Sequence, residues 1–331
     1  MIIRVPVQQS DAILGAMRAV ALAHGDGVVT DVDRRTIAAA AAIVFGRHGA
    51  DAAHPDDDAM LEQLTPCSPP QLAAALPTGD DAMQAVRMLA VMSLVDGSVD
   101  ADKTRLVQEY ATALGVDEAY LGVLAQAARG EIAAAAACIL RKNAQSFPQL
   151  NAAGIDEDAV APFLPYREHH DPALEERYRA LGDLPSDSFG WAFWDHFHRN
   201  GFAFPGNPDG LAEGFTTPHD SSHVLSGYST SQQGELCVST FIGAMHPDHP
   251  MSAEVLPVLF SWHLGIRLND IAGASTGAFA PRKFWTAWDR GTAATVDVVA
   301  ADWDFWDAAR VPLDELRRRY GIPAVADDLL A

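Results

Sequence analysis

The sequence predicts an all-α protein of two domains, and three observations lead to this prediction. The first half is rich in alanine and carries Met, Leu and Val at helical spacing. The second half holds all seven tryptophans, after residue 190, and twelve of the fourteen phenylalanines, after residue 160. In both halves, glycines and capping residues divide the apolar stretches into helical hairpins. A shift in composition of this kind is typical of two separate cores.

The predicted division is an N-terminal helical domain over residues 1–150, a linker over 151–171 and a C-terminal helical domain over 172–331. The segment from Asn143 to Asp171 contains Pro148, Pro162 and Pro165 among a cluster of acidic residues. Prolines interrupt helices, so this segment is expected to connect the two domains.

The charge of the chain narrows the classes of partner. Its 23 Lys and Arg residues are outnumbered by 44 Asp and Glu residues, which gives a net charge of −21. Such a surface repels phosphates, so we expect no nucleic-acid partner. The N-terminus lacks the apolar core of a secretory signal, and the longest apolar runs are about half the length of a transmembrane helix. We therefore expect a cytoplasmic protein with no transmembrane segment; peripheral attachment to a membrane stays open.

The first half contains an internal repeat. The segment Asp26–Thr30 (DGVVT) recurs seventy residues later as Asp96–Asp100 (DGSVD). Gly27 and Gly97 can adopt the left-handed conformation that ends a helix, and the last residue of each copy can cap the next helix. Each copy is thus predicted to be a helical hairpin, and two hairpins can bury each other's apolar faces. The expected helices are 14–23 and 33–45 in the first copy, and 88–95 and 103–114 in the second.

These residues resemble the TerB-like (tellurite-resistance) helical domain, whose hairpins carry the signature D-G-x-[IV]-[ST]-x-x-E. The resemblance covers about residues 10 to 125. At the position of the final acid this sequence has Asp33 in one copy and Lys103 in the other. The resemblance implies a domain whose acidic loops are candidate cation sites and which could recruit a protein partner or self-associate. A turn-and-cap role for Asp26 and Asp96 is the simpler interpretation.

The most specific motif is His219-Asp220-Ser221-Ser222-His223, followed after eleven residues by Glu235. On a helix, His219 and His223 are four residues apart, so both imidazoles leave the same face. This spacing is typical of two nitrogen ligands of one metal ion, to which Asp220 and Glu235 can add oxygen ligands. The alternative is that His219 lies at a helix start, where the Asp220 carboxylate interacts favourably with the helix dipole. His223 and Glu235 would then form an ordinary hydrogen bond.

Two predicted helices bring these four residues together. The first, His219–Ser226, follows Pro218 and ends at Gly227. The second runs from about Gln232 to Ala244, after a Ser- and Thr-rich capping signature. Helices joined by a tight turn lie antiparallel, so Glu235 can face both histidines. An aromatic helix over residues 188–200, begun by Ser186 or Asp187 and ended at Asn200-Gly201, is expected to precede them.

Two imidazoles and one or two carboxylates suit Zn²⁺, Fe²⁺ or Mn²⁺, with positions left open for water or substrate. His246, His249 and His263 are candidates for proton transfer by their proximity in sequence alone. A set of aromatic residues could line a lipid or quinone pocket, although core packing is their more common use. The set is Trp262, Phe284, Trp285, Trp288, Trp303, Phe305 and Trp306.

The H-D-x-x-H-x(11)-E pattern is the signature of the ubiquinone-biosynthesis family named coenzyme Q biosynthesis protein four, which the chain resembles over about residues 172–325. Segments 184–190, 200–202 and 312–323 are similar to conserved parts of that family. The Gly227-Tyr228 and Gly234-Glu235 pairs also match. The resemblance implies an all-α domain with a metal, usually zinc, and a hydrophobic cavity for an isoprenoid-tailed ring. The implied ligands are His219, Asp220, His223 and Glu235.

The resemblance also implies an activity, which is metal-dependent decarboxylation coupled to hydroxylation at the ring carbon C1. Two alternatives stay open. One is a non-enzymatic lipid-binding scaffold that organises partner enzymes around a structural metal. The other is an HD-type metal phosphohydrolase, which would need a further upstream histidine and a downstream aspartate and leaves Glu235 unexplained.

Overall fold

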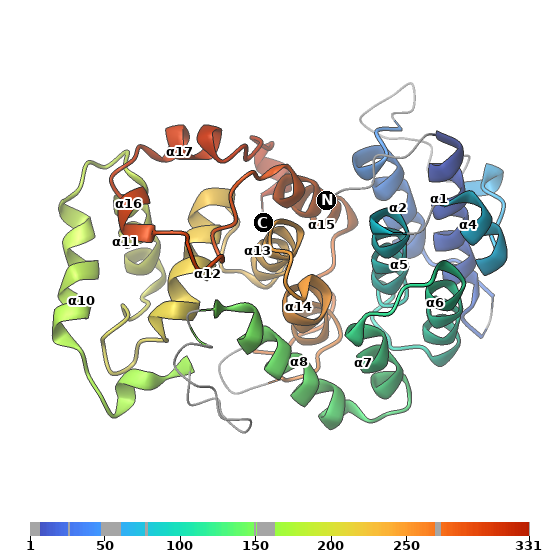
Figure 1. The fold of residues 1–331 in the computed structure, drawn as a ribbon, viewed down its shortest axis with the longest axis horizontal. Helices are drawn as coiled ribbons and strands as arrows, with labels where there is room; N and C mark the ends of the chain where they lie inside the picture. Colours follow the sequence, from blue (N-terminus) through green and yellow to red (C-terminus); the bar gives the residue numbers. More distant parts are fainter. Residues whose placement is uncertain are drawn as a thin grey trace. The chain divides into compact units, whose positions relative to one another are not determined.

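The structure, a computed structural model, describes residues 7–25, 27–47, 61–76, 79–148, 150, 163–268 and 273–330. These residues form helices and no strand (Figure 1); two isolated β-bridges pair Ser188 with Pro312 and Leu264 with Thr276. The all-α prediction is therefore confirmed. Within the described ranges, no helix combines the length and the apolar character that crossing a bilayer requires.

The chain divides into two units. Unit 1 comprises Met1–Ile139 and Leu256–Asp289, and unit 2 comprises Leu140–Val255 and Arg290–Ala331. The segment 256–289, which the sequence analysis placed in the C-terminal domain, thus groups with the N-terminal helices. Residues 151–162, most of the predicted linker, lie outside the described residues.

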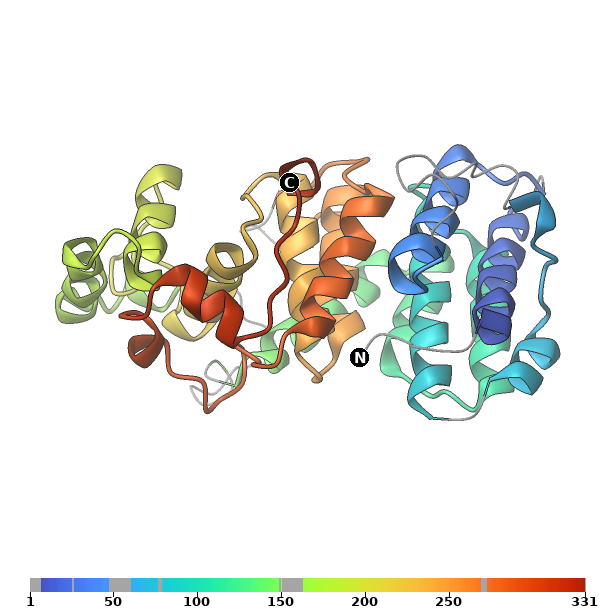
Figure 2. The same cartoon turned by 90° about the horizontal axis from the view of Figure 1, so that it is seen from above.

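Unit 1 is a bundle of helices, and Figure 2 shows its N-terminal helices packed side by side. α1 contacts α2 and α5, and α6 contacts α5, α4 and α7. The helices are α1 (Val7–Leu22), α2 (Asp31–Ala39), α4 (Pro69–Ala75), α5 (Asp80–Met92), α6 (Ala101–Leu114), α7 (Ala119–Ala128), α14 (Leu256–Val258) and most of α15 (Pro281–Ala293). Two π-helical segments, η1 (Ala40–Val44) and η6 (Leu259–His263), continue α2 and α14.

The repeated loops of unit 1 have the predicted conformation. Gly27 and Gly97 are left-handed, with φ of 66° and 83°. Thr30 caps α2 by accepting from the backbone N–H of Asp33 at 3.2 Å. Asp100 caps α6 through Oδ1, which accepts from the backbone N–H of Lys103 at 2.9 Å. The predicted turns and caps at these four residues are therefore confirmed. Asp96, for which a turn role was the simpler interpretation, accepts from the backbone N–H of Ser98 at 3.1 Å; Asp26 lies outside the described residues.

The departure from the TerB-like signature has a structural consequence. Asp33 and Lys103 occupy equivalent positions of the two copies, and both are fully buried. The Lys103 ammonium lies 2.7 Å from Oδ2 of Asp96 and 3.7 Å from Oδ1 of Asp33. Lys103 of the second copy therefore supplies the positive charge that balances the carboxylates of Asp33 and Asp96, one from each copy. A buried carboxylate needs such a partner.

Unit 2 contains the predicted metal ligands and a core of stacked aromatic rings. Its longer helices are the second half of α8 (Ile132–Ser146), α10 (Pro172–Arg179), α11 (Phe189–Asn200), α12 (Glu213–Ser226) and α13 (Gln232–Met245). Shorter pieces complete it: η3 (Pro165–Arg167), η4 (Ala180–Asp183), the π-helical η5 (Pro250–Val255), α16 (Phe305–Ala308), α17 (Leu313–Arg319) and η7 (Asp327–Leu329).

The aromatic helix α11 ends as predicted but begins at a different cap. Gly201, with φ of 67°, ends it after Asn200. Its N-cap is Ser188 and not Ser186 or Asp187, because the Ser188 hydroxyl accepts from the backbone N–H of Trp191 at 3.2 Å. The next backbone N–H, that of Phe189, donates to the carbonyl of Val311 at 2.8 Å, and this long-range contact selects the cap.

The helix that carries the histidines begins earlier than predicted. α12 starts at Glu213, so Pro218 lies inside the helix and not before it. Phe215 explains the longer helix, because its ring packs 4.9 Å from Phe147 and 5.2 Å from Phe163, measured between ring centroids. This packing of aromatic rings offsets the one backbone hydrogen bond that a proline removes.

Candidate metal centre

The loop between α12 and α13 sets the geometry of the centre. Gly227 ends α12 with φ of 81°, and Ser231 caps α13 by accepting from the backbone N–H of Gly234 at 3.1 Å. The carbonyl oxygen of Ser229 approaches Gly234 so closely that an added Cβ would lie 1.9 Å from it. Only glycine fits this position. The close approach fixes the start of α13, where Glu235 is the next residue.

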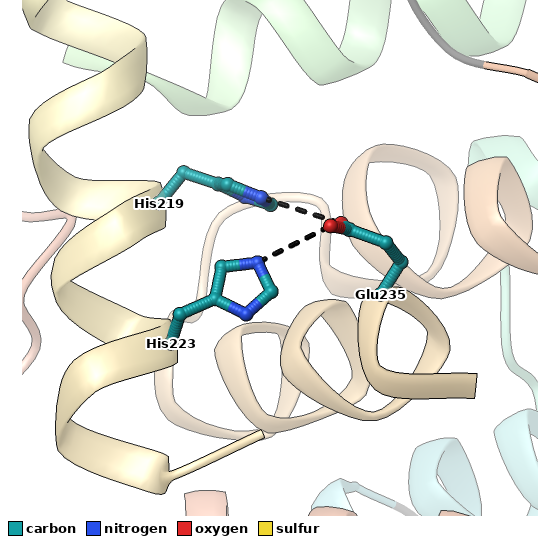
Figure 3. A group of neighbouring side chains, drawn as sticks. All are labelled: His219, His223 and Glu235. Carbon is teal, nitrogen blue, oxygen red and sulfur yellow. Dashed lines mark ion pairs between the residues drawn. The ribbon is translucent and has the colours of Figure 1, made fainter. Parts of the chain in front are cut away.

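Three of the predicted ligands converge, as Figure 3 shows. His219 and His223 project from α12 toward the Glu235 carboxylate on α13. Nε2 of His219 lies 3.5 Å from Oε2 of Glu235, and Nε2 of His223 lies 3.4 Å from Oε1. One donor atom from each of the three residues lies within 4.8 Å of the other two.

These distances fit ligands of one ion better than a direct hydrogen bond. An N–H···O hydrogen bond normally spans about 2.7–3.2 Å, which is shorter than both contacts. Ligand bonds of about 2.0–2.1 Å in tetrahedral geometry place neighbouring donor atoms about 3.3 Å apart. The two nitrogen–oxygen distances are therefore close to the spacing of ligands around a small divalent metal.

The orientation of His223 also suits a ligand. Its Nδ1 lies 3.0 Å from the carbonyl oxygen of Tyr228, which can only accept a hydrogen bond. Nδ1 must therefore carry the proton, and Nε2 of the neutral ring keeps its lone pair toward Glu235. A histidine that donates its other N–H to a carbonyl is the usual arrangement at protein metal sites. The Tyr228 of the Gly227-Tyr228 pair thus has a role through its backbone.

The centre is partly open. The side chain of His223 is 1% exposed, but those of His219 and Glu235 are 16% and 22% exposed. The His219 ring stacks on Phe215 at a centroid distance of 5.2 Å, which gives one side of the site an apolar wall. The side chains of His219 and Glu235 thus keep some exposed surface, whereas His223 is enclosed.

His219 and Glu235 stabilise each other's charged forms. Burial alone would lower the pKa of His219, but the adjacent Glu235 carboxylate outweighs burial and raises the pKa to about 9. Burial would raise the pKa of Glu235, yet the two imidazoles, His219 first, hold it well below its usual range. The site thus favours a bound cation, whether protons or a metal.

Asp220, the fourth predicted ligand, is placed differently. Its Oδ1 lies 2.8 Å from Nε2 of His196 on α11. The set of three converging residues does not include Asp220. The ring of His196 stacks on that of His223 at a centroid distance of 5.3 Å and an interplanar angle of 25°. Sequence reasoning missed His196, because nothing in its local pattern indicates a partner 24 residues away.

A second buried polar group lies in the same unit. The Glu254 carboxyl, on η5, is 2% exposed and accepts a hydrogen bond from the Ser146 hydroxyl at 3.0 Å. Burial raises its pKa to about 7. His246 follows α13, and its Nδ1 lies 2.6 Å from Oδ2 of Asp297. Burial would lower the pKa of His246, but the Asp297 carboxylate raises it.

The other predicted candidates are divided between the two units. His263 belongs to unit 1, where its Nε2 lies 3.0 Å from the carbonyl oxygen of Val95, and burial lowers its pKa. The predicted aromatic set is divided, with Trp262 to Trp288 in unit 1 and Trp303 to Trp306 in unit 2. Phe284 and Trp285 are fully buried, so they are core residues.

Comparisons with known proteins add no family. No protein-family model matches the chain, and no curated protein matches it in sequence. The function must therefore be argued from the site.

Proposed function

We propose that this chain binds one divalent transition metal at His219, His223 and Glu235 and uses it to process a hydrophobic, quinone-like substrate, as in ubiquinone biosynthesis. Zn²⁺ is the first choice, with Fe²⁺ and Mn²⁺ as alternatives, because two imidazoles and a carboxylate suit all three. The observation that carries the proposal is the convergence of three donor atoms at the spacing of ligands around one ion.

The reaction we propose is decarboxylation of a carboxylate-bearing aromatic ring, in which the bond between ring and carboxyl breaks, CO2 leaves and a proton takes its place. The hydroxylation that the resembled family couples to this step is a two-electron oxidation and requires an added oxidant such as O2. When bound, a divalent metal supplies a Lewis acid that polarises a carboxylate. The residues of the chain hold and orient this centre: the carbonyl of Tyr228 fixes His223, and Phe215 supports His219. The exposed edges of His219 and Glu235 give a substrate access.

The resemblance to the coenzyme Q biosynthesis protein four family supports the same proposal, because its H-D-x-x-H-x(11)-E pattern includes all three converging residues. An HD-type phosphohydrolase accounts less well for the site, since it assigns no role to Glu235. A scaffold with a structural metal would need a closed set of four protein ligands, whereas three converge here.

The substrate class can be tested by ligand binding. The Zn²⁺-loaded protein should bind a short-chain prenylated 4-hydroxybenzoate more tightly than 4-hydroxybenzoate itself. Burial of a five-carbon prenyl group contributes up to about 4 kcal/mol to the free energy of binding. We therefore expect the prenylated ligand to bind about tenfold more tightly, or better. If the metal positions the carboxylate, Glu235→Gln should weaken the binding of both ligands by a similar factor and leave the preference for the prenylated ligand. Equal affinity of the wild-type protein for the two ligands would contradict the proposed substrate class.

A further inference from the structure

Asp220 lies inside the metal motif, yet its carboxylate has another partner. The side chains of Asp220 and His196 are each 11% exposed, and their contact of 2.8 Å is a short, charge-assisted hydrogen bond. By contrast, the contacts within the converging set are 3.4 and 3.5 Å. The distance between Asp220 and His196 is that of a hydrogen bond, whereas the longer distances within the converging set are close to those between two ligands of one metal ion.

Helix geometry explains why Asp220 is separate. Successive residues of an α-helix are rotated by about 100°, so His219 and His223 share a face that Asp220 does not. The Asp220 side chain instead points to α11, where His196 lies. To join the three donors, Asp220 would have to give up its contact with His196.

His196 connects Asp220 with the metal site in a different way. Its ring lies against the ring of His223, while Asp220 holds Nε2. His223 is then fixed on two sides, by the Tyr228 carbonyl at Nδ1 and by the His196 ring on its face. The Tyr228 carbonyl is a typical hydrogen-bond partner of a metal-binding histidine, and the His196 ring restrains His223 further.

We propose that Asp220 is a positioning residue and not a metal ligand: it holds His196 against His223, so that the centre has three protein ligands and keeps a coordination position for an exogenous molecule. This inference rests on the proposed metal site and deepens it. An available position is what separates a metal that can act on a substrate from a purely structural one.

The first test uses Co²⁺ as a spectroscopic probe of coordination. We expect the visible bands of Co²⁺-loaded Asp220→Asn to superimpose on those of the wild-type protein, because no ligand is lost. Glu235→Gln should give different bands. Azide added to the wild-type Co²⁺ protein should shift the bands by occupying the available position. Bands of Asp220→Asn that change as those of Glu235→Gln do, or wild-type bands that azide leaves unchanged, would overturn the proposal.

The second test is a double-mutant cycle on Zn²⁺ affinity. If Asp220 acts through His196, Asp220→Asn and His196→Ala should each weaken Zn²⁺ binding by no more than about 10–100-fold. The double variant should then bind as the weaker single variant does. Multiplicative losses would show that Asp220 acts independently, as a ligand does. Circular dichroism checks that each variant is folded.

The metal site and the positioning role of Asp220 can be rejected separately. Absence of Co²⁺ and Zn²⁺ binding by the wild-type protein would reject the metal site itself. Binding by the wild-type protein that Asp220→Asn abolishes would leave the metal site intact and reject only the positioning role of Asp220.

Discussion

At the scale of single residues, Gly234 decides where the Glu235 carboxylate lies. We predict that Gly234→Ala destabilises the protein and weakens Zn²⁺ binding, because the new Cβ would meet the Ser229 carbonyl at 1.9 Å. The backbone at the start of α13 must move to relieve this clash. Thermal unfolding and Zn²⁺ titration measure the two effects.

A matched control is available in α7. Gly122 is also a helical glycine, but nothing lies within 4 Å of a Cβ added there. Gly122→Ala should therefore stabilise the protein by about 0.5–1 kcal/mol, the ordinary gain in helix propensity. If Gly234→Ala and Gly122→Ala changed the thermal stability and the Zn²⁺ affinity equally, the Ser229 carbonyl would not exclude a side chain at position 234.

The raised pKa of Glu254 should make the stability of the protein depend on pH. Burial raises its pKa to about 7 in the folded protein, above the value of 4.5 for a free glutamate. The folded state therefore binds more protons than the unfolded state, and stability falls as the pH rises from about 4.5 to 7. The difference corresponds to roughly 3 kcal/mol. In chelator-treated protein, Glu254→Gln should gain up to this amount over the wild type between pH 5 and pH 8.

Chemical denaturation at several pH values measures this effect. The exposed Glu168, in the same unit, provides the control, because Glu168→Gln should follow the wild-type pH profile. Parallel profiles of Glu254→Gln and the wild type would contradict a raised pKa for Glu254.

At the scale of elements, the two hairpins of unit 1 depend on one lysine. We predict that Lys103→Met destabilises the protein by about 3–5 kcal/mol, because the buried Asp33 and the partly buried Asp96 would lose the cation that balances their charges. Arg105→Met, two residues along α6, removes an exposed pair with Asp102 and should cost about 0–1 kcal/mol. Urea unfolding compares the two; losses of similar size would contradict the role of Lys103.

Most elements could be predicted because their signals are local. Gly97, Gly227 and Ser231 act on residues within one turn, so their sequence pattern predicts how the helices begin and end. The start of α11 at Ser188 and that of α12 at Glu213 could not be predicted. Both depend on contacts with distant segments, which a local pattern does not contain.

The candidate site could likewise be predicted from the sequence only in part. The convergence of His219, His223 and Glu235 follows from the spacing along α12 and the loop to α13. The partner of Asp220 does not, because His196 comes from α11 and only the packing of α11 on α12 brings it there.

At the scale of the whole molecule, the composition of the sequence predicted two parts, but it did not predict which segments belong to each part. The aromatic segment 256–289 resembles the second half in composition, yet it groups with unit 1. Trp285 shows why: it is fully buried, and its indole N–H donates to the carbonyl of Thr36 at 3.1 Å. A hydrogen bond between residues 249 positions apart leaves no trace in a local pattern.

The most direct test of the central claim is the metal content of purified protein. After loading with Zn²⁺ and removal of excess, the wild-type chain should retain about one equivalent, as three well-placed donors require. His223→Ala should retain almost none, whereas His169→Ala, at an exposed site in the same unit, should match the wild type. Less than about a tenth of an equivalent in the wild-type protein, as in His223→Ala, would contradict the metal site.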